Sequence, residues 1–193
     1  MIEQGNLPTQ RVNISTQKIL GGIGSILILL VFTSEATLLG IVGFVLWLIS
    51  MYQLSNILRK PSIFQKVLIG FILSTVGMVI ASTFAFGLTA GILSFAIMRD
   101  EADAILGLGL GVVVAIIVAY VIFVVAFYFY KEAYKILAQA TAHNLFKIGG
   151  LLLFIGAITT ILFGLGLLLM IVGYIVLAVA FFTAPNEVEV QGT

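Results

Sequence analysis

Few side chains in this sequence have the type and spacing that chemistry requires. The only histidine, His143, has no second histidine or nearby carboxylate with which to hold a metal ion, and cysteine is absent. Asp100, Glu101 and Asp103 form the densest carboxylate group and could bind Ca²⁺ or Mg²⁺. Their spacing matches no known cation loop, so we expect a solvated loop. The sequence thus predicts no catalytic residues, no metal and no cofactor, and an enzyme is the least favoured class.

Composition indicates a membrane protein. Of the 193 residues, 62% are hydrophobic and 9% are charged, whereas roughly 25% are charged in an ordinary soluble domain. The net charge is +1 and the basic residues are spread singly, which argues against nucleic acid as a partner. Membrane lipids are the expected surroundings.

Long apolar runs separated by short polar loops predict an all-α, polytopic transmembrane helical bundle. The expected spans are 18–33, 37–58, 66–98, 104–130, 147–163 and 166–183. They form one domain, 18–184, between a tail at 1–17 and a tail at 185–193. At ~1.5 Å per residue, one helix over 148–182 would exceed the bilayer by ~20 Å, so we divide that run near Gly164. A single crossing stays the alternative and would place the C-terminal tail outside.

The basic residues orient these spans. Arg99 lies on one side, and eight others fall on the opposite side: Arg11, Lys18, Arg59, Lys60, Lys66, Lys131, Lys135 and Lys147. Because cytoplasmic loops retain Lys and Arg, we expect a multi-pass cell-membrane protein with its N-terminus, and its C-terminus too, in the cytoplasm. Lys18, Lys66 and Lys147 each precede an apolar run. They could anchor the helices at the cytoplasmic interface or contact lipid headgroups or an anionic solute.

Short internal similarities favour three repeated hairpins. Lys18–Gly22 (KILGG) in the first span resembles Lys147–Gly150 (KIGG) in the fifth, and Ile41–Phe44 (IVGF) in the second resembles Ile171–Tyr174 (IVGY) in the sixth. Apolar, glycine-rich sequences also align by chance, so a true repeat and a chance similarity both stay open as interpretations. If real, it resembles the parallel repeats of some transporters.

Small and hydroxyl residues mark the third and fourth spans. Ser74, Ser82 and Thr89 share one helical face, which could line a solute path or pack against a neighbouring helix. Trp47, near the middle of the second span, is expected to be a buried packing residue. Two Gly-x-x-x-Gly motifs favour close helix packing at the outer end, through Gly87, Gly91, Gly107 and Gly111.

Three segments resemble a known family. Lys18–Gly24 (KILGGIG), Ser62–Phe64 (SIF) and Asn144–Leu151 (NLFKIGGL) are similar to domain-of-unknown-function family 996, a group of mainly archaeal multi-pass membrane proteins. The resemblance covers about residues 14–184. The family carries no assigned activity, so the resemblance implies an uncharacterised membrane protein and supplies no site residues.

Two functions of different class follow from these observations. Away from their ends the spans lack Asp, Glu, Lys, Arg and His, which argues against a proton-coupled pump. The leading hypothesis is a non-enzymatic accessory or scaffolding component, packed as a homo-oligomer or within a larger membrane complex. The alternative is a small-solute or ion permease or channel that selects through carbonyls and hydroxyls. A water-accessible polar cavity near the midplane would favour the permease, and a dry interior the accessory component.

Overall fold

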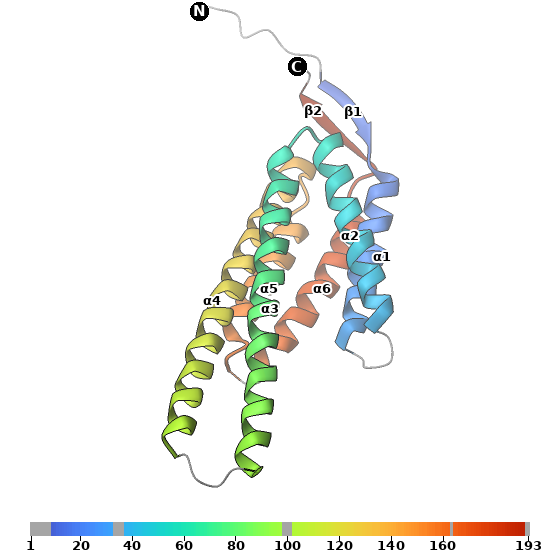
Figure 1. Cartoon of the computed structure of the whole chain (residues 1–193). Coiled ribbons are helices and arrows are strands. Elements are labelled where there is room, and N and C mark those ends of the chain that lie inside the picture. Colours follow the sequence, from blue (N-terminus) through green and yellow to red (C-terminus); the bar gives the residue numbers. More distant parts are fainter. Residues whose placement is uncertain (1–8, 33–36, 98–101, 163, 192–193) are drawn as a thin grey trace, which may run out of the picture.

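The computed structural model describes residues 9–32, 37–97, 102–162 and 164–191. Side chains are described for residues 10–31, 37–87, 111–162 and 164–190. The elements are β1 (Thr9–Asn13), α1 (Ser15–Leu29), the 3-10 turn η1 (Leu30–Phe32), α2 (Thr37–Ile57), α3 (Pro61–Ile97), α4 (Ala102–Thr141), α5 (Leu145–Thr159), α6 (Leu165–Thr183) and β2 (Glu187–Gln191) (Figure 1). The all-helical class is confirmed.

Helix length separates these elements into two groups. Four helical segments are long and apolar enough to cross a membrane: Thr37–Ile57, Pro61–Gly87, Gly111–Thr141 and Leu165–Thr183. The apolar helices α1 and α5 have 15 residues each, which is ~22 Å at ~1.5 Å per residue, against ~30 Å of hydrocarbon. The structure therefore supports a membrane protein, while six crossings remain a prediction.

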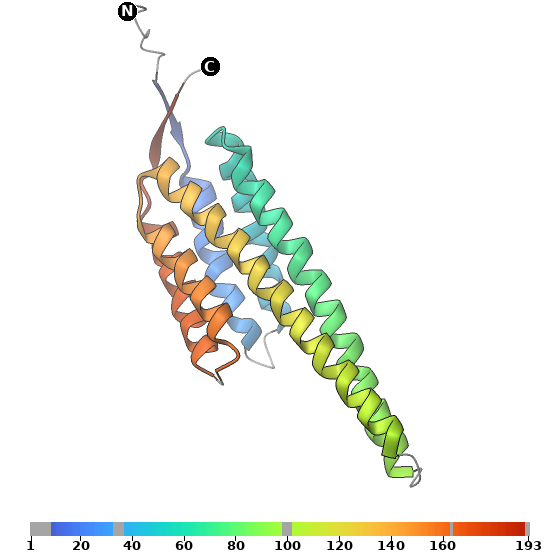
Figure 2. The same ribbon diagram turned by 90° about the vertical axis from the view of Figure 1, so that its left-hand side faces the viewer.

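The six helices form a closed ring. Their most extensive contacts lie within three pairs that are adjacent in sequence, α1 with α2, α3 with α4, and α5 with α6. Contacts of α4 with α5 and of α1 with α6 join these pairs, and the smaller contact of α2 with α3 completes the ring (Figures 1 and 2). The pairs coincide with the predicted hairpins, but their relation as repeats stays a prediction.

Glycines allow the helices of the first and third pairs to approach closely. A Cβ atom placed on Gly24 of α1 would lie 2.6 Å from the backbone nitrogen of Trp47 on α2. A Cβ atom placed on Gly156 of α5 would lie 2.9 Å from the carbonyl oxygen of Gly166 on α6. Because both neighbours are backbone atoms, any side chain at these positions would push the two helices apart.

The two tails pair with each other, which the sequence analysis did not predict. Strands β1 and β2 are antiparallel, with Val12 opposite Val188 and Arg11 opposite Glu189. The Arg11 Nε atom lies 3.5 Å from a carboxylate oxygen of Glu189. Both strands therefore lie at the same end of the bundle (Figure 1). Which side of a membrane this end faces stays a prediction.

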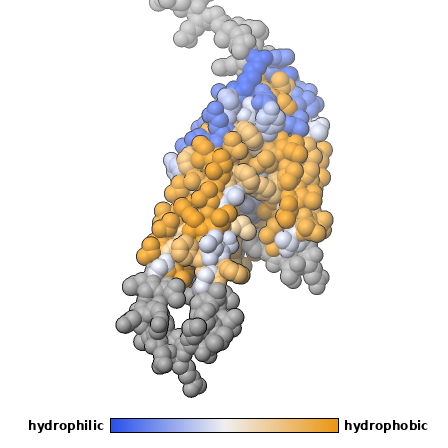
Figure 3. All heavy atoms as spheres, in the orientation of Figure 1, coloured by the Kyte–Doolittle hydropathy of each residue, from blue (hydrophilic) through white to orange (hydrophobic). Residues whose placement is uncertain are grey.

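Helices α3 and α4 are much longer than the others, with 37 and 40 residues. Two views show that this pair extends past the other four helices at the end away from the strands (Figures 1 and 2). The surface along the helices is mostly hydrophobic, and hydrophilic residues gather at the strand-bearing end (Figure 3). This separation is the one expected for a bundle surrounded by lipid.

Candidate functional site: an aromatic cavity inside the helix ring

A cavity of about 200 Å³ lies inside the ring, and all six helices contribute to its wall. It is lined by Ile28 of α1, Phe44 and Trp47 of α2, Ser74 of α3, Phe123, Phe127, Tyr130 and Tyr134 of α4, Leu153 of α5, and Tyr174 of α6. The wall is thus largely aromatic, and none of the described residues that line it is charged.

One hydrogen bond crosses the ring from α2 to α4. The indole Nε1 of Trp47 donates to the hydroxyl oxygen of Tyr134 at 2.7 Å. Trp47 is 4% exposed and Tyr134 is 1% exposed. A buried indole N–H needs an acceptor, and the tyrosine supplies it. The burial predicted for Trp47 is confirmed.

Ring contacts fix the positions of the aromatic side chains. The Trp47 ring meets Tyr130 edge-on with centroids 5.7 Å apart, and Tyr130 meets Phe127 edge-on at 5.5 Å. Phe44 lies 5.6 Å from Trp47, also measured between centroids. Aromatic pairs favour such tilted and edge-on geometry, so the wall of the cavity is well packed.

The hydroxyl groups of the cavity differ in their hydrogen-bond partners. Ser74 donates to the carbonyl oxygen of Phe71 at 2.9 Å, which leaves its oxygen to accept from Tyr130 at 3.4 Å. Tyr134 accepts from Trp47, and its own proton has no acceptor among the described residues. The Tyr174 hydroxyl likewise has no hydrogen-bond partner in the described part of the chain. Two phenol donors are therefore available at the wall.

The cavity reaches the surface between α2 and α3. These two helices make the smallest contact of any neighbouring pair in the ring. Phe44 and Ser74 line the cavity from these two helices, and Tyr174 lines it from α6 behind them. Figure 3 shows a hollow in the apolar surface at this place, with paler, less hydrophobic atoms within and beside it.

Comparison with known proteins places the chain in a family. Residues 39–175 match the family model described as "Protein of unknown function (DUF996)". The chain belongs to domain-of-unknown-function family 996. An "Uncharacterized protein MJ1644" from the archaeon Methanocaldococcus jannaschii is similar to this family-996 protein, with 31% identity over 179 residues, 93% of this chain and 97% of that protein. No solved structure matches. The predicted resemblance is confirmed.

The three lysines predicted to anchor the helices at the cytoplasmic interface or to contact lipid headgroups have different surroundings in this family-996 protein. Lys18 Nζ donates to the carbonyl oxygen of Ala184 at the end of α6, at 2.6 Å. Lys66 Nζ lies 5.9 Å from the centre of the Phe129 ring. Lys147 is exposed. Lys18 thus has a structural partner, while contact of the three with lipid headgroups stays a prediction.

The predicted packing glycines lie at the free end of the α3–α4 pair. A Cβ atom placed on Gly87 or on Gly111 would meet no heavy atom within 4 Å. Gly91 and Gly107 lie in the helical segments whose side-chain surroundings are not described. Any close contact at Gly87 or Gly111 must therefore come from outside the described part of this chain, and packing there stays a prediction.

The other candidate residues are scattered. Asp100 and Glu101 lie outside the described residues, and so does the side chain of Asp103. His143 Nε2 lies 2.9 Å from the hydroxyl of Thr183, so the histidine joins the α4–α5 turn to α6. Among the described residues, no group of three or more His, Asp or Glu side chains could hold a metal ion.

The hydroxyl face predicted on α3 divides into two parts. Ser74 lines the cavity. Ser82 is exposed and donates to the carbonyl oxygen of Val79 in its own helix at 3.0 Å, whereas the side chain of Thr89 is not described. Only the first of these three residues is placed at a candidate site.

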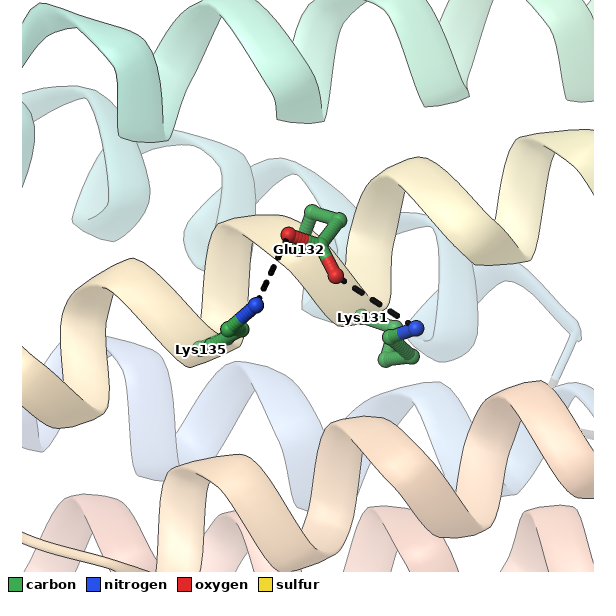
Figure 4. A network of polar contacts seen from close by, with 3 residues as sticks. All are labelled: Lys131, Glu132 and Lys135. Atoms are coloured by element: carbon green, nitrogen blue, oxygen red, sulfur yellow. Dashed lines mark ion pairs between the residues drawn. The ribbon is translucent and has the colours of Figure 1, made fainter.

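A charged cluster on α4 escaped the sequence analysis (Figure 4). A Glu132 carboxylate oxygen lies 3.4 Å from Lys131 Nζ, and the other oxygen lies 3.5 Å from Lys135 Nζ. Lys131 Nζ also lies 4.7 Å and 5.0 Å from the ring centres of Tyr128 and Phe154. The spacing of Glu132 and Lys135, three residues apart on a helix, was an available signal. The contact of Lys131 with Phe154 joins α4 to α5, and the three charged residues are not among those that line the cavity.

Proposed function

We propose that this family-996 protein is a non-enzymatic, accessory or scaffolding component of a membrane assembly. The length of the α3–α4 pair is the observation that supports this most. At ~1.5 Å per residue, α3 with its 37 residues and α4 with its 40 are ~55 Å and ~60 Å long. The four other helices have 15 to 21 residues.

The outer end of this pair reaches beyond the hydrocarbon of an ordinary bilayer. From Lys66, expected at the cytoplasmic interface, α3 continues to Ile97, a rise of ~47 Å. Even at a steep tilt of ~40° that stretch would span ~36 Å, against ~30 Å of hydrocarbon. The final turns nevertheless read GLTAGILSFAI, without a charge. An apolar helix end at this depth is stabilised by a protein partner that covers it.

The partner in this proposal is a helix of another membrane-embedded chain, from a second copy or a different protein. No described atom lies within 4 Å of a Cβ placed on Gly87 or Gly111, so such a helix could approach the backbone closely there. No charged side chain is present in this part of α3 to oppose an apolar partner. The aromatic cavity contributes no acid–base pair to suggest catalysis.

All six helices cross the membrane in this proposal, with both termini in the cytoplasm. The pairing of β1 with β2 supports it, because an even number of crossings returns the chain to the side on which it began. The short helix α1 is lengthened by η1, which continues to Phe32. Basic residues such as Lys18 and Lys147 lie near the strand-bearing end. An excess of lysine and arginine is typical of the cytoplasmic face of a membrane protein.

The proposal is tested by mild extraction of a C-terminally tagged chain from its native membrane, followed by native mass spectrometry. A stoichiometric partner or homo-oligomer is expected, and the double variant Gly87→Leu, Gly111→Leu should lose it without a change in thermal stability. Ala81→Leu, another enlargement at an exposed position on α3, is the matched control and should keep the partner. A lone monomer under the same conditions would contradict the proposal.

The cavity favours a second candidate, a permease for a small neutral solute. It lies among the middle turns of α2, α5 and α6, and its mainly apolar wall includes the hydroxyl groups of Ser74, Tyr130, Tyr134 and Tyr174. In liposomes, a permease would raise solute flux, and Ser74→Leu should abolish that flux while Ser82→Leu should not, because only Ser74 lines the cavity. Flux no greater than that of empty liposomes would contradict the permease and leave the accessory component as the proposed function.

A further inference from the structure

We propose that the cavity binds a small, neutral, ring-shaped molecule that carries a hydrogen-bond-accepting oxygen and enters from the lipid. This inference does not depend on the accessory role, since it concerns the inside of the ring and the proposed partner contact lies at the end of the α3–α4 pair. It rests on the size of the cavity, the donors in its wall and the position of its opening.

The size of the cavity sets the size of the ligand. Its volume is about 200 Å³, and an apolar cavity of ~150 Å³ is known to take up benzene. The space therefore suits one six-membered ring with a small substituent. Phe44, Phe127 and Leu153 provide flat, apolar wall for the faces and edges of such a ring.

The hydroxyl groups specify the polar part of the ligand. Tyr174 has no hydrogen-bond partner among the described residues, and the proton of Tyr134 has no acceptor there. In this proposal a carbonyl or ether oxygen on the ring accepts from the Tyr174 hydroxyl, because the Tyr134 hydroxyl is already bonded to Trp47. Burying the ligand oxygen without such a hydrogen bond would be costly. No described charged side chain lines the cavity, so an ionised ligand would lose its hydration without compensation.

The opening indicates the phase from which the ligand comes. It lies between α2 and α3, two helices whose outward faces carry exposed apolar side chains such as Val45, Ile69 and Ile72. A molecule dissolved in the bilayer can reach this opening directly, whereas a strongly polar solute would first have to leave water. The geometry therefore favours a membrane-soluble ligand.

Trp47 provides a direct measurement, because it is the only tryptophan in the chain and it lines the cavity. The full-length protein in phosphatidylcholine nanodiscs is titrated with acetophenone, a ring ketone that quenches indole fluorescence. α-Methylstyrene, which has the same shape but no oxygen, is measured by competition. Saturable quenching is expected, with acetophenone bound about fivefold more tightly than α-methylstyrene, as one additional hydrogen bond provides.

The decisive variant is Tyr174→Phe, which removes only the Tyr174 hydroxyl and should leave the fold intact. It should weaken acetophenone about fivefold and leave α-methylstyrene unchanged. Tyr52→Phe, on the exposed side of α2, is the matched control and should change neither. Ser74→Leu fills the cavity and should abolish saturable binding of both probes.

Three results would overturn the inference. Quenching that rises linearly without saturation would mean that acetophenone merely dissolves in the lipid. Equal affinity of the two probes would remove the role of the acceptor oxygen. A fivefold difference that survives in Tyr174→Phe, in a protein with unchanged thermal stability, would show that the Tyr174 hydroxyl is not the donor.

Discussion

Trp47 of α2 and Tyr134 of α4 share a 2.7 Å hydrogen bond inside the ring, although these two helices are not neighbours in it. The two residues are 87 positions apart in the sequence. The bond therefore fixes the distance across the bundle, which contacts between adjacent helices alone leave free.

Replacing Tyr134 with phenylalanine should destabilise the protein by about 1–3 kcal/mol, because it leaves the buried indole N–H of Trp47 without an acceptor. The measurement is chemical unfolding in detergent, followed by Trp47 fluorescence. Tyr52→Phe serves as the control at an exposed tyrosine. Equal midpoints for the two variants would mean that the bond across the ring adds nothing to stability.

Gly24→Ala should destabilise the fold by about 1–3 kcal/mol, because the new methyl group would lie 2.6 Å from the backbone of α2. Gly87→Ala is the matched control, since no described atom lies within 4 Å of its Cβ position. Alanine favours a helix over glycine, so this control should be neutral or more stable by up to about 1 kcal/mol. The measurement is thermal unfolding of both variants in the same detergent. A similar loss of stability in the two variants would contradict the close packing of α1 against α2.

The two tail strands should form a disulfide when Val12→Cys is combined with Val188→Cys. These residues lie directly opposite each other, where Cα atoms are ~4.5–5.5 Å apart, a distance that a disulfide spans. The chain has no cysteine of its own to compete.

The control for the tail disulfide is Val12→Cys with Val190→Cys, because Val190 pairs with Gln10 instead. The oxidised pair at the matched register should run faster on a denaturing gel and be lighter by two hydrogens. Cross-linking at the same rate in both pairs would indicate mobile tails without a fixed register.

Lys18→Met should lower the free energy of unfolding by about 1 kcal/mol, since it removes a charged donor from the carbonyl oxygen of Ala184, the residue that follows α6. The magnitude is modest because Lys18 is only half-buried. Lys147→Met removes an exposed lysine in the corresponding position of the fifth helix and should have no measurable effect. If both substitutions lower stability equally, loss of charge at this end of the bundle is the cause, and the bond to Ala184 is not.

Hydropathy predicted the helices well where the chain is continuously apolar. The second span was expected over 37–58 and α2 covers Thr37–Ile57, while the sixth was expected over 166–183 and α6 covers Leu165–Thr183. The first span, expected over 18–33, begins earlier at Ser15 and tightens into η1 after Leu29. Hydropathy does not register this change, because residues in a 3-10 turn can be as apolar as those in a helix.

Sequence reasoning missed the features that depend on distant contacts. The alternation of glutamate with Val188 and Val190 is a strand signal, but its polar partner around Arg11 lies at the other end of the chain. The position of Trp47 predicted burial, yet could not show that Tyr134 faces it. With twenty glycines in the chain, their spacing alone could not single out Gly24 as the one that α2 approaches.

The pairing of β1 with β2 determines when this protein can finish folding. The ring closes through the contact of α1 with α6 and through the tail strands, so its first and last segments must meet. Helix α6 and strand β2 follow the other described elements in the chain, and until α6 is synthesised α1 can pack only against α2 and η1. Closure of the ring is thus a late step in folding, because it waits for α6 and β2 to meet α1 and β1.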